Sequence, residues 1–268
     1  MPLTDGRDAQ APRWESTLVP GPGGTGRDGI PVRIHRAPAT GPGPLVWAHG
    51  GGWRAGSVED WHPACAELAV AASATVISVG YRLAPRHPHP AALLDVLAVM
   101  DWAQRRSRLP IAVGGDSAGG TVAACAALVW RDERRRLAAQ ILAYAPIDPG
   151  CEEPSYHRDP RAFPHRAELM AAWREYRGSA ARHPAATGPA PLYSTPAEAD
   201  DLTGLAPAIL AVGALDPVVD DVRGYAQRLR DAGNRVELTE FENVPHGAFL
   251  SRAGFRRRLG TTYARRTT

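Results

Sequence analysis

Residues 111–121 read Ile-Ala-Val-Gly-Gly-Asp-Ser-Ala-Gly-Gly-Thr, and this stretch decides the fold. It joins a short apolar run at residues 111–113, which predicts a strand, to a helical stretch that starts at Thr121. A Gly-x-Ser-x-Gly sequence between a strand and a helix is typical of a nucleophile elbow, a turn too tight for a Cβ beside the serine. The pattern predicts that Ser117 projects above a sheet as a nucleophile. The alternative is a glycine-rich turn that only closes a strand–helix unit.

Strands and helices alternate along the chain on both sides of this turn. Apolar and β-branched runs predict further strands at residues 14–19, 30–36, 45–48, 75–79, 140–145, 209–212 and 236–241. Helical periodicity predicts helices at 64–72, 90–105, 121–131, 167–177 and 222–231, and one more near the C-terminus. This alternation predicts the α/β fold class, with a mostly parallel central sheet and helices on both of its faces.

Residues 150–205 interrupt the alternation with many prolines and one helical stretch. Excursions of this length inside a compact domain are usually functional. We therefore expect a single α/β domain, residues 1–268, in which 150–205 form a cap-like insertion over the sheet. Its apolar side chains include Phe163, Leu169, Met170, Trp173 and Tyr176. These are enough to line a small pocket, although some of them must pack the cap onto the sheet.

A second glycine run, His49-Gly50-Gly51-Gly52-Trp53, follows the strand predicted at 45–48 directly. Residues without side chains let backbone N–H groups approach an oxyanion, as the transfer of an acyl group requires. We predict an oxyanion hole made by the N–H groups of Gly51, Gly52 and Ala118. A phosphate-binding loop is the rival interpretation, but the run lacks both the Gly-Lys-Ser/Thr ending and the G-x-G-x-x-G spacing.

A base for Ser117 is predicted from chain order and position. In a catalytic triad carried by this kind of sheet, the serine comes first along the chain, the acid second and the histidine last. His246 lies in the loop after the strand predicted at 236–241, whereas the other histidines that follow Ser117 fall within 150–205. Bases of this kind are commonly carried by loops. His246 is therefore the predicted base.

The acid that orients this base should follow the preceding strand. Asp216 comes directly after the strand predicted at 209–212. Asp220 and Asp221 are alternatives, but both come later, where the next helix is expected to start. A different interpretation makes Asp216 the N-cap of that helix, with Pro217 at its first position.

Three motifs together resemble the hormone-sensitive-lipase-like family of bacterial carboxylesterases. They are the glycine run at 49–53, the sequence Tyr81-Arg82-Leu83-Ala84-Pro85 with the His-Pro-rich stretch after it, and Gly115–Gly120. The regions around Asp216 and His246 agree with the same family, so the resemblance covers about residues 45–250. It implies an α/β-hydrolase fold and cofactor-free hydrolysis of small acyl esters, with Ser117, Asp216 and His246 as the catalytic residues.

The resemblance also has consequences for the shape of the site. Members of the family usually carry a longer N-terminal region that forms part of a cap, whereas 48 residues precede His49 here. We therefore expect a small, reduced cap and a more open site. A site without a long apolar groove favours short acyl chains, from about acetyl to hexanoyl, because each buried CH₂ contributes only ~0.8 kcal/mol.

Composition excludes several classes of protein. The formal net charge is +3, and arginine supplies all 31 basic side chains. The short arginine runs 134–136 and 256–258 lack interleaved aromatic residues or a nucleic-acid-binding motif, so no nucleic-acid partner is expected. No apolar run approaches the ~20 residues of a membrane span, and the first residues do not resemble a signal peptide. We expect no membrane partner, and a monomer or homodimer that binds a small acyl ester.

The cysteines point to a reducing compartment. Cys65, Cys125 and Cys151 are odd in number and show no metal-ligand spacing. Buried, reduced thiols in a cytoplasmic protein are the expectation, with no metal site and no cofactor.

Three alternative functions stay open. The His-Gly-Gly-x-Trp loop and the short N-terminal region also resemble arylformamidases, which cleave an N-formyl group with the same catalytic set. Removal of an acyl group in natural-product biosynthesis is a second alternative. A non-catalytic binding protein on the same scaffold is a third, because a fold alone never proves an activity.

Overall fold

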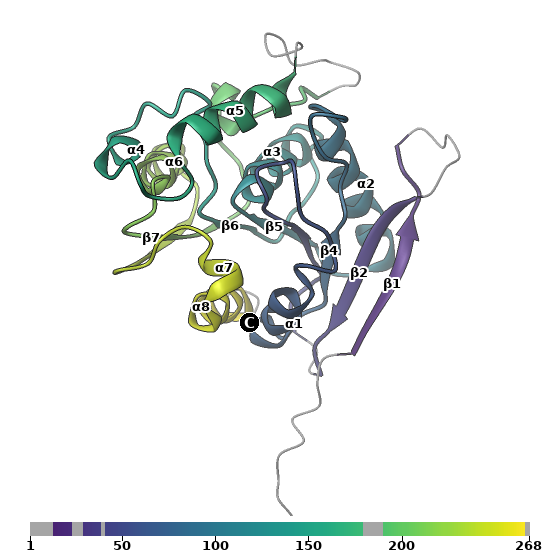
Figure 1. Cartoon of the computed structure of the whole chain (residues 1–268). Helices are drawn as coiled ribbons and strands as arrows, with labels where there is room; N and C mark the ends of the chain where they lie inside the picture. Colours follow the sequence, from purple (N-terminus) through teal and green to yellow (C-terminus); the bar gives the residue numbers. More distant parts are fainter. Residues whose placement is uncertain (1–12, 23–28, 39–40, 179–189, 266–268) are drawn as a thin grey trace, which may run out of the picture.

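One eight-stranded sheet runs through the chain in the computed structural model, which describes residues 13–22, 29–38, 41–178 and 190–265 (Figure 1). Its strands are β1 (Arg13–Val19), β2 (Ile30–Arg36), β3 (Leu45–Ala48), β4 (Val76–Val79), β5 (Ala112–Asp116), β6 (Gln140–Ala143), β7 (Ala208–Gly213) and β8 (Val236–Phe241). They lie in the order β1-β2-β4-β3-β5-β6-β7-β8. Strand β2 is antiparallel to both of its neighbours, and every other pair after it is parallel. The predicted mostly parallel sheet is confirmed.

Helices cover both faces of this sheet. They are α1 (His62–Ala72), α2 (Ala91–Arg106), α3 (Ala118–Asp132), α4 (Ser155–Arg158), α5 (Arg166–Arg177), η1 (Pro196–Glu198), α6 (Val219–Asp231), α7 (Ala248–Ser251) and α8 (Ala253–Arg265). Helices α1 and α8 pack together on one face, and α2, α3 and α6 lie on the other (Figure 1). Every residue of β3 to β7 is buried, which agrees with the mostly apolar sequences of these strands.

Two element boundaries differ from the predictions near the expected nucleophile. Strand β5 continues to Asp116 and α3 starts at Ala118, three residues before the predicted helix, so a single residue makes the turn. Strand β6 ends at Ala143 rather than at residue 145, because Tyr144 adopts a positive φ of 39°. Both differences bring side chains to the same edge of the sheet.

Residues 150–205 contain α4, α5 and η1 in their described part. Helix α5 lies above the ends of β5 and β6 in Figure 1. The rings of Trp173 and Tyr176 from α5 pack against Trp53, with centroids 4.3 and 4.6 Å apart, so these two side chains pack the segment onto the domain. Residues 179–189 of the expected cap, and the first twelve residues of the chain, lie outside the described residues.

Candidate active site

The carboxyl ends of the parallel strands bring the predicted site residues together. Residues that directly follow β3, β5, β6, β7 and β8 line or support one cavity, because parallel strands end at the same edge of a sheet. The sequence separations are large, since Ser117 and His246 are 129 residues apart. Only the sheet topology places them side by side.

Ser117 occupies a turn with unusual backbone geometry. Its φ and ψ are 50° and −125°, a conformation that few residues other than glycine adopt. The neighbouring glycines explain how so tight a turn is accommodated. A Cβ on Gly115 would lie 2.4 Å from the Gly119 carbonyl, and one on Gly119 would lie 2.1 Å from the Ala48 carbonyl oxygen. The glycines are therefore required by close backbone approach on both sides of the serine.

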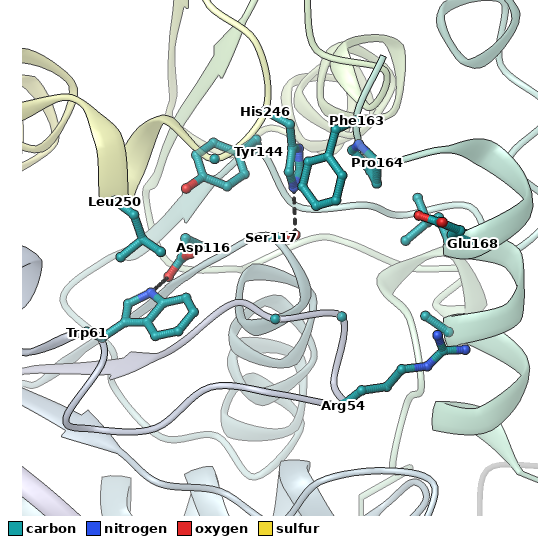
Figure 2. A pocket seen from close by; sticks show the side chains of 15 residues that line it. Arg54, Trp61, Asp116, Ser117, Tyr144, Phe163, Pro164, Glu168, His246 and Leu250 are labelled. Carbon is teal, nitrogen blue, oxygen red and sulfur yellow. Dashed lines mark hydrogen bonds between the residues drawn. The ribbon is translucent and has the colours of Figure 1, made fainter. Parts of the chain in front are cut away.

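A hydrogen-bonded series joins the three predicted catalytic side chains. The Ser117 Oγ lies 2.9 Å from the His246 Nε2 (Figure 2), and the His246 Nδ1 lies 2.9 and 2.8 Å from the two carboxylate oxygens of Asp216. Asp216 is buried, and its Oδ1 also accepts a hydrogen bond from the Val218 N–H at 3.0 Å. An imidazole held in this way keeps its proton on Nδ1 and leaves Nε2 free to accept one from the serine.

The rival acids are directed elsewhere. Asp220 pairs with Arg223 at 2.9 Å, and Asp221 accepts hydrogen bonds from Tyr156 and from the backbone of Ile147. Burial raises the pKa of Asp221 to about 6. Neither carboxylate contacts the imidazole of His246. Helix α6 has Val218 as its N-cap residue, and the Asp216 carboxylate accepts the Val218 N–H while it also contacts His246, so the two interpretations of Asp216 do not exclude each other.

The residues predicted to form the oxyanion hole surround the serine. Gly51 and Gly52 line the same cavity as Ser117 and have positive φ values of 105° and 61°. A Cβ on Gly51 would lie 2.1 Å from the Ala55 carbonyl oxygen, so this loop needs glycine there. Ala118 is the first residue of α3, where the helix leaves its N–H groups unpaired. In the described residues, none of these three N–H groups has a hydrogen-bond partner.

The segment Tyr81–Pro85 supports the glycine loop from behind. The Tyr81 hydroxyl donates a hydrogen bond to the His49 carbonyl at 2.6 Å, and the Ala84 N–H donates one to the Trp53 carbonyl at 2.9 Å. The His49 ring stacks on Tyr81 and donates from Nδ1 to the Gly50 carbonyl. Burial lowers the pKa of His49 to about 4, so its ring is neutral at pH 7 and serves the structure of the loop.

Asp116, the residue before the serine, is a second buried carboxyl beside the site. Its Oδ1 accepts hydrogen bonds from the indole N–H groups of Trp61 at 2.8 Å and Trp47 at 3.1 Å. Its Oδ2 lies against the backbone of Gly50, where an added Cβ would come within 2.7 Å. Burial raises the pKa of Asp116 to about 7, although the indole hydrogen bonds oppose this shift. The carboxyl thus ties the glycine loop to the end of β5.

The cavity above Ser117 encloses about 390 Å³, within the range of small-molecule sites (Figure 2). Its lining residues are Gly51, Gly52, Arg54, Trp61, Asp116, Ser117, Tyr144, Phe163, Pro164, Glu168, Leu169, Ala172, His246, Gly247 and Leu250. Most of its surface is apolar. Such a cavity suits a small substrate with one reactive polar group at the serine.

Several lining residues were not predicted from the sequence. Tyr144 follows β6 directly, so its position at the carboxyl edge of the sheet could have identified it. Its ring contacts that of His246 edge-on, with centroids 4.7 Å apart, and its hydroxyl accepts the Phe249 N–H. No sequence pattern marks Trp61 or Leu250 as part of the cavity. Of the apolar cap residues named from the sequence, Phe163 and Leu169 line the cavity.

Two further structural results concern metals and membranes. No group of three or more histidine, cysteine or acidic side chains within the described ranges is arranged to hold a metal ion. In the same ranges, none of the helices is both long and apolar enough to cross a membrane.

Comparison with known proteins gives consistent matches. Residues 45–250 match a protein family described as the alpha/beta hydrolase fold. The chain is 34% identical over 242 residues to the carboxylic ester hydrolase LipN of Mycobacterium tuberculosis, covering 85% of this chain and 62% of LipN. It is 32% identical over 241 residues to an ethyl acetate hydrolase of Pseudomonas putida, covering 83% of this chain and 73% of that protein. This chain therefore spans less than two thirds of the length of LipN.

A solved structure extends the match to the whole architecture. An esterase from the bacterial hormone-sensitive lipase family superposes with a TM-score of 0.82 at 28% sequence identity. The superposition covers 100% of this chain and 87% of that one.

Proposed function

Because the chain belongs to the hormone-sensitive-lipase-like family of alpha/beta hydrolases, we propose that it is a serine carboxylesterase. It cleaves small carboxylic esters through an acyl-enzyme intermediate. Ser117 is the nucleophile, His246 the general base and Asp216 the acid that orients the imidazole. The names of two relatives, a carboxylic ester hydrolase and an ethyl acetate hydrolase, support this assignment.

The proposed reaction follows from the geometry of the three side chains. Ser117 Oγ attacks the ester carbonyl carbon while His246 Nε2 takes its proton, and Asp216 stabilises the imidazolium that forms. The carbonyl oxygen becomes an oxyanion that accepts hydrogen bonds from the backbone N–H groups of the predicted oxyanion hole. The alcohol leaves with the proton that His246 returns. Water then attacks the acyl-enzyme by the same route and releases the carboxylic acid.

One observation carries the proposal. It is the unbroken series of hydrogen bonds from Ser117 through His246 to the buried Asp216, at the edge of an apolar cavity. The test is turnover of 4-nitrophenyl acetate, compared with turnover of N-formylkynurenine. Faster cleavage of the ester supports the carboxylesterase. Faster cleavage of the formamide would indicate an arylformamidase, and turnover of neither, with no labelling by a fluorophosphonate, would indicate a binding protein.

We also propose that the enzyme prefers short acyl chains. The cavity of about 390 Å³ has room for a small ester, and Phe163, Leu169 and Ala172 of the proposed small cap line it. The rate constant kcat/KM should fall from the acetyl and hexanoyl esters of 4-nitrophenol to the dodecanoyl ester. A steady rise through dodecanoyl would contradict this part of the proposal. The cytoplasmic location and the monomeric or homodimeric state stay predictions from the sequence.

A further inference from the structure

One wall of the cavity carries a carboxylate that has no protein partner. Glu168 lies in the first turn of α5 and lines the cavity. In Figure 2 its carboxylate projects from the helix toward the cavity, on the side of Phe163 and Pro164. It forms no hydrogen bond or ion pair with any other residue in the described part of the chain. Glu168 is exposed, so water solvates its charge in the free protein and the carboxylate is open to an incoming cation.

Among the described residues that line the cavity, the single arginine is already paired. Arg54 extends toward α5, where its Nε lies 2.7 Å from a carboxylate oxygen of Glu175. The charges of Arg54 and Glu175 offset one another, so Glu168 makes this end of the cavity net negative.

An aromatic ring lines the same cavity, and in Figure 2 Pro164 lies between this ring, that of Phe163, and the Glu168 carboxylate. Phe163 is 64% exposed, although large apolar side chains are usually covered. Its ring contacts the His246 ring edge-on, with centroids 5.7 Å apart. A carboxylate and an open aromatic ring together form the surroundings that bind ammonium groups, through charge attraction and cation–π contact.

The position of Phe163 also indicates which part of an ester reaches this wall. His246 must give its proton to the departing alcohol, so the alcohol oxygen lies beside the imidazole in the proposed reaction. Phe163 contacts that imidazole. The alcohol part of the substrate, rather than the acyl part, therefore extends toward Phe163 and Glu168.

We propose that the preferred substrates are esters of amino alcohols, whose ammonium group binds between the Glu168 carboxylate and the Phe163 ring. This inference rests on the proposed esterase function and specifies its substrate class. Hydrolysis is unchanged chemically: water adds to the acyl group, and the amino alcohol leaves with the proton from His246. Glu168 and Phe163 bind the cation and take no part in the bonds that form and break at Ser117.

The test compares two thioesters of the same shape that differ by one charge. Acetylthiocholine carries a quaternary nitrogen where S-(3,3-dimethylbutyl) thioacetate carries a carbon, and both release a thiol that is measured directly. The wild-type enzyme should have the higher kcat/KM for acetylthiocholine. Glu168→Gln should lower the ratio of the two kcat/KM values about twofold to fivefold, the size of one exposed charge interaction. Phe163→Leu should lower it about twofold to threefold.

Two controls separate this inference from the proposed function. Turnover of 4-nitrophenyl acetate, which has no cation, measures any general loss of activity in Glu168→Gln, and kcat/KM for acetylthiocholine should fall by more than that loss. Glu153→Gln removes an exposed carboxylate of the same segment outside the cavity and should leave the thioester ratio unchanged. Added salt should reduce the wild-type ratio, because exposed charges are screened.

The inference would be overturned if wild type preferred the neutral thioester, or cleaved neither one while cleaving 4-nitrophenyl acetate. The same holds if Glu168→Gln kept the wild-type ratio, because the carboxylate would then serve only the stability of α5. Loss of all ester turnover in the wild-type protein would instead contradict the esterase assignment.

Discussion

The floor of the cavity and its α5 wall are built in different ways. The floor consists of residues at strand ends, among them Ser117, Asp216 and His246, whose side chains are joined by hydrogen bonds of 2.8–2.9 Å. The wall, residues 163–172, presents the exposed Phe163 and the unpaired Glu168 beside buried Leu169.

This difference separates chemistry from selection. Reacting groups need positions that are fixed to a fraction of an ångström, and close glycine contacts and buried hydrogen bonds provide them. A selective wall needs only the correct charge and shape, so its side chains can be exposed and replaceable. Substitutions in the floor should therefore change the rate on every substrate, whereas substitutions in the wall should change the choice of substrate.

The largest effect is expected from Ser117→Ala. Loss of the nucleophile should lower kcat for 4-nitrophenyl acetate by roughly 10⁴-fold to 10⁶-fold, because the remaining residues cannot form an acyl-enzyme. The circular dichroism spectrum should match that of wild type, and a fluorophosphonate should label wild type at Ser117 and leave the variant unlabelled. Retention of a tenth of wild-type turnover would show that catalysis does not depend on Ser117.

Asp216→Asn should have the next largest effect. An amide at this position favours the wrong imidazole tautomer, a change that costs about 10⁴-fold in kcat in a serine protease. Asp220→Asn should cost less than about tenfold, since that carboxylate pairs with Arg223 rather than with the imidazole. Kinetics of both variants and of Asp221→Asn, on folded protein, make the comparison. If Asp221→Asn had the lowest kcat, the acid would be misassigned.

Asp116→Asn tests the part of the floor that holds the glycine loop. Asparagine can accept the hydrogen bonds from Trp47 and Trp61 through its oxygen, but its NH₂ group would face the Gly50 backbone in place of Oδ2. The loop should shift, and kcat should fall about tenfold with little change in KM, less than the loss of an oxyanion-hole donor causes. An unchanged kcat would show that Asp116 does not influence the reaction.

The same variant should change how stability depends on pH. Burial raises the pKa of Asp116 from its ordinary 3.8 to about 7, so the folded chain holds this proton more tightly than the unfolded chain does. Its contribution to stability is fully present below pH 3.8 and is lost as the pH rises through about 7. Urea unfolding at pH 5 and pH 8 should therefore show a smaller stability difference in Asp116→Asn than in wild type. The exposed Asp231→Asn should keep the wild-type difference.

The smallest effect on the rate is expected from Leu169→Ala in the wall. Removal of this buried side chain should cost about 2–5 kcal/mol of stability, while kcat/KM for 4-nitrophenyl acetate stays within a few-fold. The enlarged cavity should move the preferred acyl or alcohol chain one or two carbons longer. Leu229→Ala, a buried leucine of α6 away from the cavity, should lose similar stability without a change in chain-length preference. A rate loss in Leu169→Ala as large as in Asp116→Asn would contradict the expectation that wall residues affect substrate choice rather than the rate.

The residues at the strand ends could be placed from sequence because local patterns mark them. Glycines around Ser117 identify the turn, and the alternation of strands and helices predicts parallel strands whose ends meet at one edge. Chain order then leaves His246 and Asp216 as partners. The structure brings these side chains within hydrogen-bonding distance, although their catalytic roles stay proposals until the variants are measured.

What the sequence by itself determined is thus the α/β architecture and the set of residues at the ends of its strands, since each is signalled by neighbours in the chain. Only the tertiary structure decided the partners of Asp116, whose indole donors lie 55 and 69 residues away in the sequence. It also decided that Phe163 and Glu168 of the wall face the cavity rather than solvent alone. These features depend on packing between distant elements, and no local periodicity records which side chains such packing brings together.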